Sequence, residues 1–444
     1  MLNIEKLIII NKSELKYSFY IYFINLKIKN YMFDKLCIKS KELGDQKIDI
    51  GFLCEALIFY EKVVLLAYKE EIILLLKFFG ERRLEKLIDE GRLELLVRED
   101  ILGTMMFPVG KDEKYNIDVF SKKGETYSSI LYEAHRELVK NSTQNTAFAK
   151  KFSKLTKPFR YGKEVTEQIR ADFNDVEYLK LILPIYFNSV VKDANLPEEI
   201  EVAITKDSSF GRFEAYSMES NIDLKGLNQK LKEQEPHTTY EIGYSGFILS
   251  IAESRGDIFI ASTLEGELVT SDLYSKFIQQ KIDEIISKHT KSKEQLSSFE
   301  EYIFEYNSIR EAFNNNGAGS KELIDILDNS NKFKIWLKDV PKNKDLVKEY
   351  YKAITAKTWA DKLPAKTTRF MLFTGIGLAL DAAGTGGLGT LLSTVLSGTD
   401  SFYLDKILKG WKPNQFIDDQ ILPIIKKWND YSDKIGKLLM QWYI

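Results

Sequence analysis

The sequence GFLCEALIFYEKVVLLAYKEEIILLLKFFGERRLEKLIDEGRLELLV, residues 51–97, decides the fold class. Its apolar spacing changes several times, which predicts a helix over 52–60, a strand over 63–67, helices over 70–79 and 81–89, and a strand over 93–97. Gly80 and Gly91 end the two later helices, since glycine readily adopts the backbone conformation of a helix C-terminus. The alternation of short helices and apolar strands predicts a small αβ unit.

The chain that follows continues as a mixture of strands and helices. The patterns predict a hairpin of 105–109 with 116–120 in the same sheet, helices over 128–140 and 146–155, a helix over 165–191 bent or broken at Pro184, and a strand over 199–205 that pairs with 211–218. Two short apolar runs, 246–251 and 258–264, fit a helix or a strand equally well. From Ser271 onward the spacing is nearly all helical. We therefore expect an α+β protein.

The length of 444 residues predicts more than one domain, because single cores rarely serve more than roughly 100 to 200 residues. The expected division is a possible N-terminal extension over 1–31, a small αβ domain over 32–122, a central α+β domain over 123–291, and a C-terminal helical domain over 292–444. Met32 opens a segment that resembles an ordinary domain start.

Composition limits the function classes. The 63 basic and 65 acidic residues give a formal charge of -2, so the whole molecule has no field that would gather nucleic acid or an anionic membrane. The two cysteines, Cys37 and Cys54, lie in apolar surroundings and are predicted to be buried and reduced, which favours a cytoplasmic location. Charged residues interrupt the N-terminal apolar run, so we expect no signal peptide. The heavy use of Lys, Ile, Asn and Tyr suggests a bacterial source.

Motifs for catalysis and cofactor binding are missing from the sequence. There is no phosphate-binding GxxxxGK[ST] and no zinc-binding HExxH, and the three histidines are far apart. We therefore expect no catalytic residue, no metal and no cofactor, and the chain is interpreted as a non-enzyme.

A basic segment is the strongest local charge signal. No acidic residue occurs from Leu138 through Lys163, and Phe148, Phe152, Phe159 and Tyr161 are interleaved with the cations. Cations neutralise phosphates and aromatic rings stack on bases, so the segment is a candidate polyanion contact. A solvated basic helix with its aromatic residues in the core is the alternative. The candidate residues are Lys150, Lys151, Lys154, Lys157, Arg160 and Lys163.

The stretch 370–396 is long, apolar and rich in glycine, with one charge at Asp381. Its length would span a bilayer, but the central Asp and the glycines make insertion as a single helix marginal. We predict instead a buried helical hairpin that turns near Gly386. A conditionally inserting hairpin is the alternative, with Phe370, Phe373, Asp381, Gly386 and Leu392 as its marker residues.

Three functions therefore stay open. The leading hypothesis is a non-enzymatic bacterial intracellular interaction or regulatory protein that acts through a macromolecular partner, most simply another protein. The alternatives are a stress or phage-defence effector that permeabilises membranes through 370–396, and a nucleic-acid-binding protein that uses 150–163.

Overall fold

The computed structural model describes residues 35–39, 48–109, 112–121, 126–207, 214–264, 266–288, 299–304, 308–314, 318–339, 368–373 and parts of 417–427. The elements in chain order are β1 (Lys35–Lys39), α2 (Ile50–Phe59), β2 (Lys62–Ala67), α3 (Lys69–Asp89), β3 (Leu93–Arg98), β4 (Asp100–Val109), β5 (Asp112–Ser121), α4 (Tyr127–Arg136), α5 (Ser142–Leu155), β6 (Lys157–Phe159), α6 (Lys163–Asn174), α7 (Val176–Val190), β7 (Val202–Asp207), β8 (Ala215–Ser220), α8 (Leu224–Gln234), α9 (Tyr244–Leu264), β9 (Glu267–Thr270), α10 (Asp272–Lys288), β10 (Phe299–Phe304), α11 (Ser308–Asn314), α12 (Ser320–Asn329), α13 (Asn331–Asp339), β11 (Thr368–Phe373) and a π-helical turn, η4 (Ile417–Ile421).

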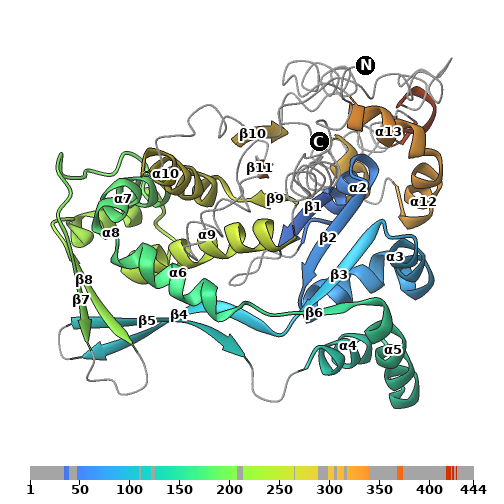
Figure 1. The fold of residues 1–444 in the computed structure, drawn as a ribbon, viewed down its shortest axis with the longest axis horizontal. Coiled ribbons are helices and arrows are strands. Elements are labelled where there is room, and N and C mark those ends of the chain that lie inside the picture. Colours follow the sequence, from blue (N-terminus) through green and yellow to red (C-terminus); the bar gives the residue numbers. More distant parts are fainter. Residues whose placement is uncertain are drawn as a thin grey trace, which may run out of the picture.

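A seven-stranded sheet crosses the middle of the molecule, between two groups of helices (Figure 1). Its strand order is β10-β11-β9-β1-β2-β3-β6. The five strands β9, β1, β2, β3 and β6 are parallel, whereas β11 is antiparallel to both β9 and β10. The protein is therefore α+β, as predicted, and its sheets contain both parallel and antiparallel pairs.

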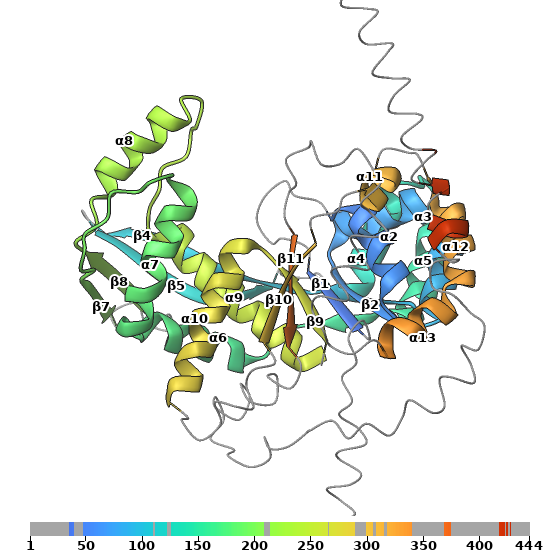
Figure 2. The ribbon, with the colours of Figure 1, turned by 90° about the horizontal axis from the view of Figure 1, so that it is seen from above.

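The strands of this sheet are apolar on both faces because helices cover both. Along β3, Leu93, Leu95 and Val97 join the core beneath α2, α3, α4 and α5, while Leu96 joins the core shared with α6, α7, α9 and α10. Alternate residues of a strand point to opposite faces, so the near-continuous apolar run is what a sheet buried on both sides requires. Figure 2 shows α9 and α10 on one side of β1, with α2 and α3 on the other.

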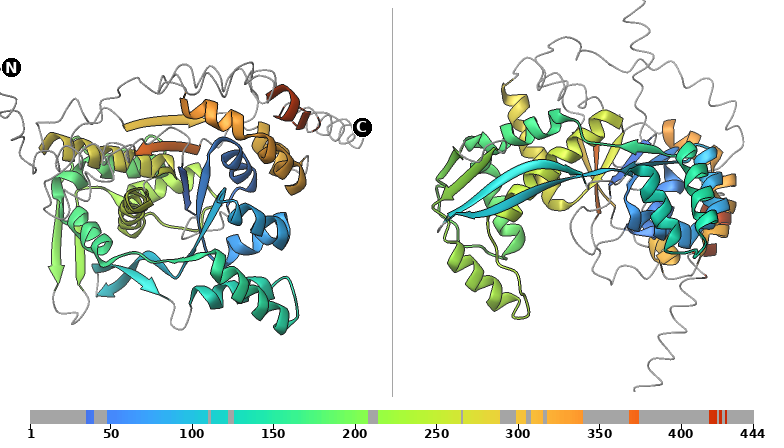
Figure 3. Two further views of the ribbon diagram at one scale, coloured as in Figure 1. Left: turned by 45° about the vertical axis from the view of Figure 1, so that its right-hand side comes forward. Right: turned by 90° about the horizontal axis from the view of Figure 1, so that it is seen from below.

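A second, four-stranded antiparallel sheet has the order β4-β5-β8-β7. The predicted hairpin forms as β4 and β5, and the predicted pairing of two later strands forms as β7 and β8. The prediction that the hairpin extends the first sheet is wrong, because β6 takes the place beside β3. Figure 3 shows β4 and β5 as a long ribbon that leaves the parallel sheet and reaches β7 and β8.

The helix predicted over 165–191 is broken, but not at Pro184. The break is at Asp175, whose carboxylate accepts a hydrogen bond from the backbone N–H of Tyr178, 3.2 Å away, and so caps α7. Pro184 lies inside α7. The two helices predicted on either side of Gly80 are present within α3, and they meet at Gly80, whose backbone is not helical, with φ 68° and ψ 163°.

The prediction of an all-helical C-terminal unit is wrong in part. Residues 299–304 and 368–373 form strands β10 and β11, so Phe370 and Phe373 belong to a sheet strand and not to a helical hairpin. The remainder of that stretch, with Asp381, Gly386 and Leu392, lies outside the described residues, as does the possible extension 1–31.

The predicted domain ranges share one sheet and one core. The seven-stranded sheet takes strands from the ranges 32–122, 123–291 and 292–444. Leu323 of α12 and Phe313 of α11 join the same core as Leu53 of α2. Cys37 and Cys54 are both buried, as predicted.

Candidate functional site

The carboxyl ends of β1 and β9 meet at the point where the chain reverses its direction across the parallel sheet. From β1 the chain moves to β2 and β3 on one side, and β9 later pairs with the other side of β1. Lys39 and Thr270 are the last residues of these strands, and the register places them next to each other. In open α/β sheets, ligands and catalytic groups gather outside the carboxyl ends of strands at such a switch point.

Helix α9 supplies two carboxylates to this point, from residues one helical turn apart. The Nζ of Lys39 lies 2.5 Å from Oε2 of Glu253 and 2.5 Å from Oδ1 of Asp257. Thr270 donates its hydroxyl hydrogen to Oδ2 of Asp257 across 2.5 Å. We call Lys39, Glu253, Asp257 and Thr270 the carboxyl-edge cluster.

The carboxyl-edge cluster is withdrawn from water. The side chains of Lys39, Glu253 and Asp257 are 6%, 5% and 1% exposed. Burial raises the pKa of Asp257, the Lys39 ammonium opposes that rise, and the neighbouring Glu253 adds to it. One ammonium thus serves two carboxylates, and each group finds its partner inside the cluster.

The opposite side of α9 is tied down by a second ion network. Arg255 donates two hydrogen bonds to Asp172 of α6, with both N···O distances 2.6 Å. Lys281 of α10 lies 3.0 Å from the same carboxylate and 4.7 Å from the ring centroid of Tyr178. Since α9 is held through charges on two sides, it joins the parallel sheet to the helices of the other end of the molecule.

A third group of charges marks the exit from β3. Arg98 is 1% exposed, and it is followed by the buried Glu99 and Asp100. Glu99 accepts a hydrogen bond from the exposed Arg160 across 2.5 Å, and Asp100 accepts one from the backbone N–H of Tyr161 at 3.2 Å. Burial raises the pKa of Asp100 to about 6, against the lowering effects of the Tyr161 N–H and of Arg98 and Arg160. These contacts hold together the two neighbouring segments through which the chain leaves the parallel sheet.

The structure separates the basic segment from its interleaved aromatic residues. Phe148 and Phe152 stack on each other with centroids 4.2 Å apart, and all four aromatic residues are buried. They therefore cannot stack on bases in this conformation. The six cations are exposed, and three of them form ion pairs: Lys151 with Glu85, Lys157 with Glu94, and Arg160 with Glu99.

The described ranges contain no candidate metal site and no candidate membrane-spanning helix. Over these residues no three or more His, Cys, Asp or Glu side chains are grouped so as to hold a metal ion. No helix within the same ranges is both long and apolar enough to cross a bilayer.

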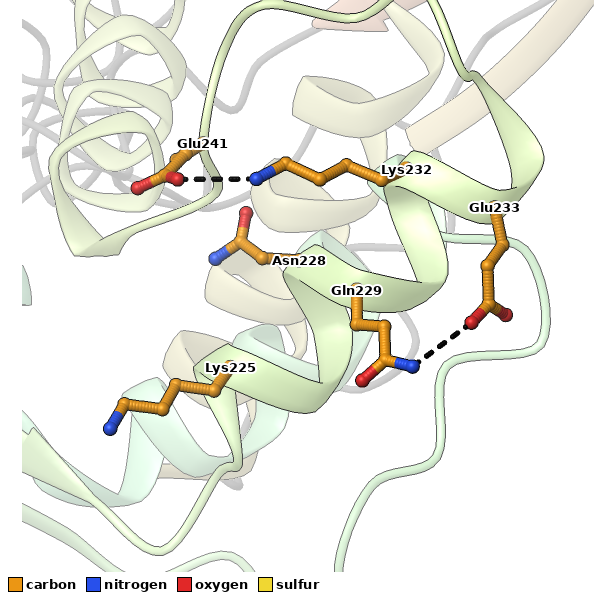
Figure 4. A pocket seen from close by; sticks show the side chains of 6 residues that line it. All are labelled: Lys225, Asn228, Gln229, Lys232, Glu233 and Glu241. Carbon is orange, nitrogen blue, oxygen red and sulfur yellow. Dashed lines mark hydrogen bonds and ion pairs between the residues drawn. The ribbon is translucent and has the colours of Figure 1, made fainter.

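A polar hollow beside α8 is shown in Figure 4. Lys232 points toward Glu241, with 3.4 Å between Nζ and Oε1, and Gln229 donates to Glu233 across 3.1 Å. Lys225 and Asn228 complete its wall. Two lysines and two glutamates line the hollow, so it concentrates neither sign of charge.

We found no significant match for the chain among protein-family models, curated proteins or solved structures.

The carboxyl-edge cluster is not among the residues that the sequence singled out. Glu253 and Asp257 lie in the part of the chain whose two apolar runs could not be assigned, and α9 has no polar face to reveal it. The available signal was the group Glu253, Arg255 and Asp257 inside a run of apolar residues, because buried charges need partners.

Proposed function

We propose that the chain is a non-enzymatic interaction or regulatory protein of the bacterial cytoplasm, and that it binds a protein partner along strand β7. The observation that carries this proposal is the position of β7 at the edge of the four-stranded sheet. Within the residues that the structure describes, β7 pairs with β8 alone. Figure 1 shows both strands at the end of the molecule farthest from α3 and α5.

An edge strand presents unpaired backbone N–H and C=O groups along its outer side. An extended segment of a partner can add as the next strand and satisfy them. β7 suits this role because its exposed residues Ala203 and Thr205 are small, while Val202 and Ile204 pack partly against the core and hold the strand in place. The adjoining Lys206 is paired with Glu214 of the same sheet, with 2.6 Å between Nζ and Oε1.

The opposite edge of the same sheet is less suited to a partner. β4 contains Pro108, which has no N–H to donate to an added strand. The two edges therefore differ in their capacity for strand addition, and the proposal names β7.

The ion pairs at the carboxyl ends of the parallel strands support a non-enzymatic role. A catalytic acid, base or nucleophile must reach its substrate, whereas Lys39, Glu253 and Asp257 are buried and bound to one another. Their arrangement fits a structural contact that holds α9 against the sheet better than it fits a reaction centre. The alternatives of membrane permeabilisation through 370–396 and of nucleic-acid contact through 150–163 stay predictions.

The test uses proline substitutions at two neighbouring positions, Ala203→Pro and Ile204→Pro. Successive N–H groups of a strand point to opposite sides, so one proline removes a bond to β8 and the other removes only an outward donor. Ile204 packs partly against the core, so Ile204→Ala, which loses the same packing and keeps the N–H, is the reference for Ile204→Pro, and the parent chain is the reference for Ala203→Pro. The proline variant that loses only the outward donor should melt like its reference. It should also lose the protein that co-purifies with the full-length chain in defined stoichiometry. Retention of that protein by the outward variant would refute the contact. Metal-dependent nuclease or hydrolase turnover, abolished by a single carboxylate change, would overturn the non-enzymatic assignment.

A further inference from the structure

The two faces of strand β7 differ in chemistry, because successive residues of a strand point to opposite faces. Val202 and Ile204 lie on the face that packs partly against the core shared with α7. Ala203 and Thr205 lie on the other face and are exposed. A strand that adds beside β7 would therefore also have one face toward the core and one toward solvent.

The core-side face is incomplete at this edge. On the β8 side, Ile204 pairs with the buried Met218. Val202 and Ile204 are only partly buried, and no described strand covers their other side. In an antiparallel pair, side chains directly opposite each other have Cβ atoms about 4.5–5.5 Å apart. Apolar residues on an added strand would lie beside these two residues and remove more of their surface from water.

Two carboxylates flank the exposed face. Glu219 of β8 lies directly opposite Ala203. Glu201 continues the same face two residues before Ala203, since the N–H of Asn221 donates to its carbonyl across 3.4 Å and extends the ladder by one pair. Both glutamates are exposed, and neither forms an ion pair with a residue that the structure describes. The exposed face therefore has an unbalanced negative charge at this edge.

Ala203 leaves room for a long side chain to cross β7. Neighbouring strands lie about 4.8 Å apart, so an added strand is about two such spacings from β8. A lysine or arginine opposite Ala203 can extend over this small side chain toward the carboxylate of Glu219. The same cation lies diagonally across from Glu201. An acidic residue at that position would instead face two like charges.

We propose that the partner of β7 is an extended segment of another protein in which apolar residues alternate with lysine or arginine. This inference rests on the proposed function, which places the docking strand at β7. Backbone pairing supplies affinity, and the alternate side chains supply specificity: the apolar residues complete the core-side face, and the basic residues balance Glu201 and Glu219. A second copy of β7 lacks this pattern, because its one cation, Lys206, is already paired with Glu214.

The test measures binding of short labelled peptides to the full-length chain by fluorescence anisotropy at physiological ionic strength. One peptide alternates valine with arginine, and a second alternates valine with glutamate. A third has the composition of the first, with its valines and arginines in separate blocks. We expect saturable binding of the first peptide. The second presents like charges to the glutamates, and the third cannot place valine and arginine on opposite faces, so both should bind at least about 10-fold more weakly.

Glu201→Gln combined with Glu219→Gln should weaken binding of the valine–arginine peptide about 3- to 10-fold, which is the combined effect of two exposed ion pairs. The matched control is Asp89→Asn combined with Glu137→Gln. It also removes two exposed carboxylates, but from α3 and the end of α4, which lie far from β7 (Figure 1). The control should bind like the parent chain, and both double variants should melt like it, because all four residues are exposed.

The proposal is overturned if the valine–arginine peptide does not bind, or if the Glu201 and Glu219 double variant binds it like the control. It is also overturned if the chain is a dimer that the β7 proline variant converts to a monomer, because a second copy then occupies the edge. Equal binding of the valine–glutamate peptide, abolished by the proline variant that loses only the outward donor, would refute the basic partner and support strand addition at β7. If that proline variant binds the valine–arginine peptide as tightly as its reference, the docking strand itself is wrong.

Discussion

Replacing Lys39 by Met tests whether the carboxyl-edge cluster is a structural lock. The substitution keeps most of the apolar volume of the side chain and removes the only ammonium that contacts both Glu253 and Asp257 in the described structure. Two carboxylates that are 5% and 1% exposed then face each other without a cation. Removing one partner of a buried ion pair costs about 3–5 kcal/mol, and we expect about 3 kcal/mol at pH 7 because protonation of Asp257 relieves part of the repulsion.

The assay is urea unfolding followed by fluorescence, with the midpoint compared at an unchanged slope. The loss should shrink toward pH 4, because burial raises the pKa of Asp257 and this carboxyl then takes up a proton and no longer needs a cation. Adding Glu253→Gln and Asp257→Asn to Lys39→Met should recover most of the stability, since neutral groups leave no buried charge. Lys154→Met, at an exposed position, is the control and should stay within about 0.5 kcal/mol of the parent chain. The reasoning is refuted if Lys39→Met unfolds at the same urea concentration as the parent chain, or if its loss of stability does not depend on pH.

Three further predictions concern packing and pH. Gly51→Ala should lower the free energy of unfolding by about 1–3 kcal/mol, because the new Cβ would lie 2.1 Å from the carbonyl oxygen of Arg310. Gly243→Ala is the control: its Cβ would have no neighbour within 4 Å, so the same denaturation assay should show almost no change. Asp100→Asn should remove one contribution to the pH dependence of the free energy of unfolding. The pKa of Asp100 is raised from 3.8 to about 6 in the folded chain, so its contribution to stability is greatest below pH 4. That contribution is lost as the pH rises through 6, by at most about 3 kcal/mol. The melting temperature of Asp100→Asn should therefore exceed that of the parent chain at pH 7 but not at pH 4. Phe148→Ala should lower the free energy of unfolding in urea by about 3–5 kcal/mol, because Phe148 is buried in the core. Replacing an exposed residue that stacks on bases would change it by less than about 0.5 kcal/mol.

The elements with a local signal could be predicted from the sequence. The helix and strand that begin near Phe52 and Val63, the kink at Gly80 and the hairpin of β4 with β5 all depend on spacing or on a turn within a few residues. The predicted break at Pro184 was wrong because the capping side chain of Asp175 sets the start of α7.

The candidate site and the sheet order could not be predicted, since both depend on contacts between distant parts of the chain. Lys39 meets Glu253 only because β9 returns to the side of β1 after more than two hundred residues. Helix α9 is buried along its whole circumference, so its sequence has no polar face to give a helical period. β11 joins the sheet through backbone pairing with β9 and β10, and its apolar residues fit a strand as well as the helix that was predicted.

The place of β1 inside the seven-stranded sheet has a consequence for biosynthesis. During translation β1 can pair with β2 almost at once, but its other edge stays open until the ribosome has released β9, and the outer strands arrive later still. An apolar strand with one bare edge is prone to pair with the wrong chain while it waits. Nascent chains stalled before β9 should therefore recruit chaperones, and chains released after β11 should leave them.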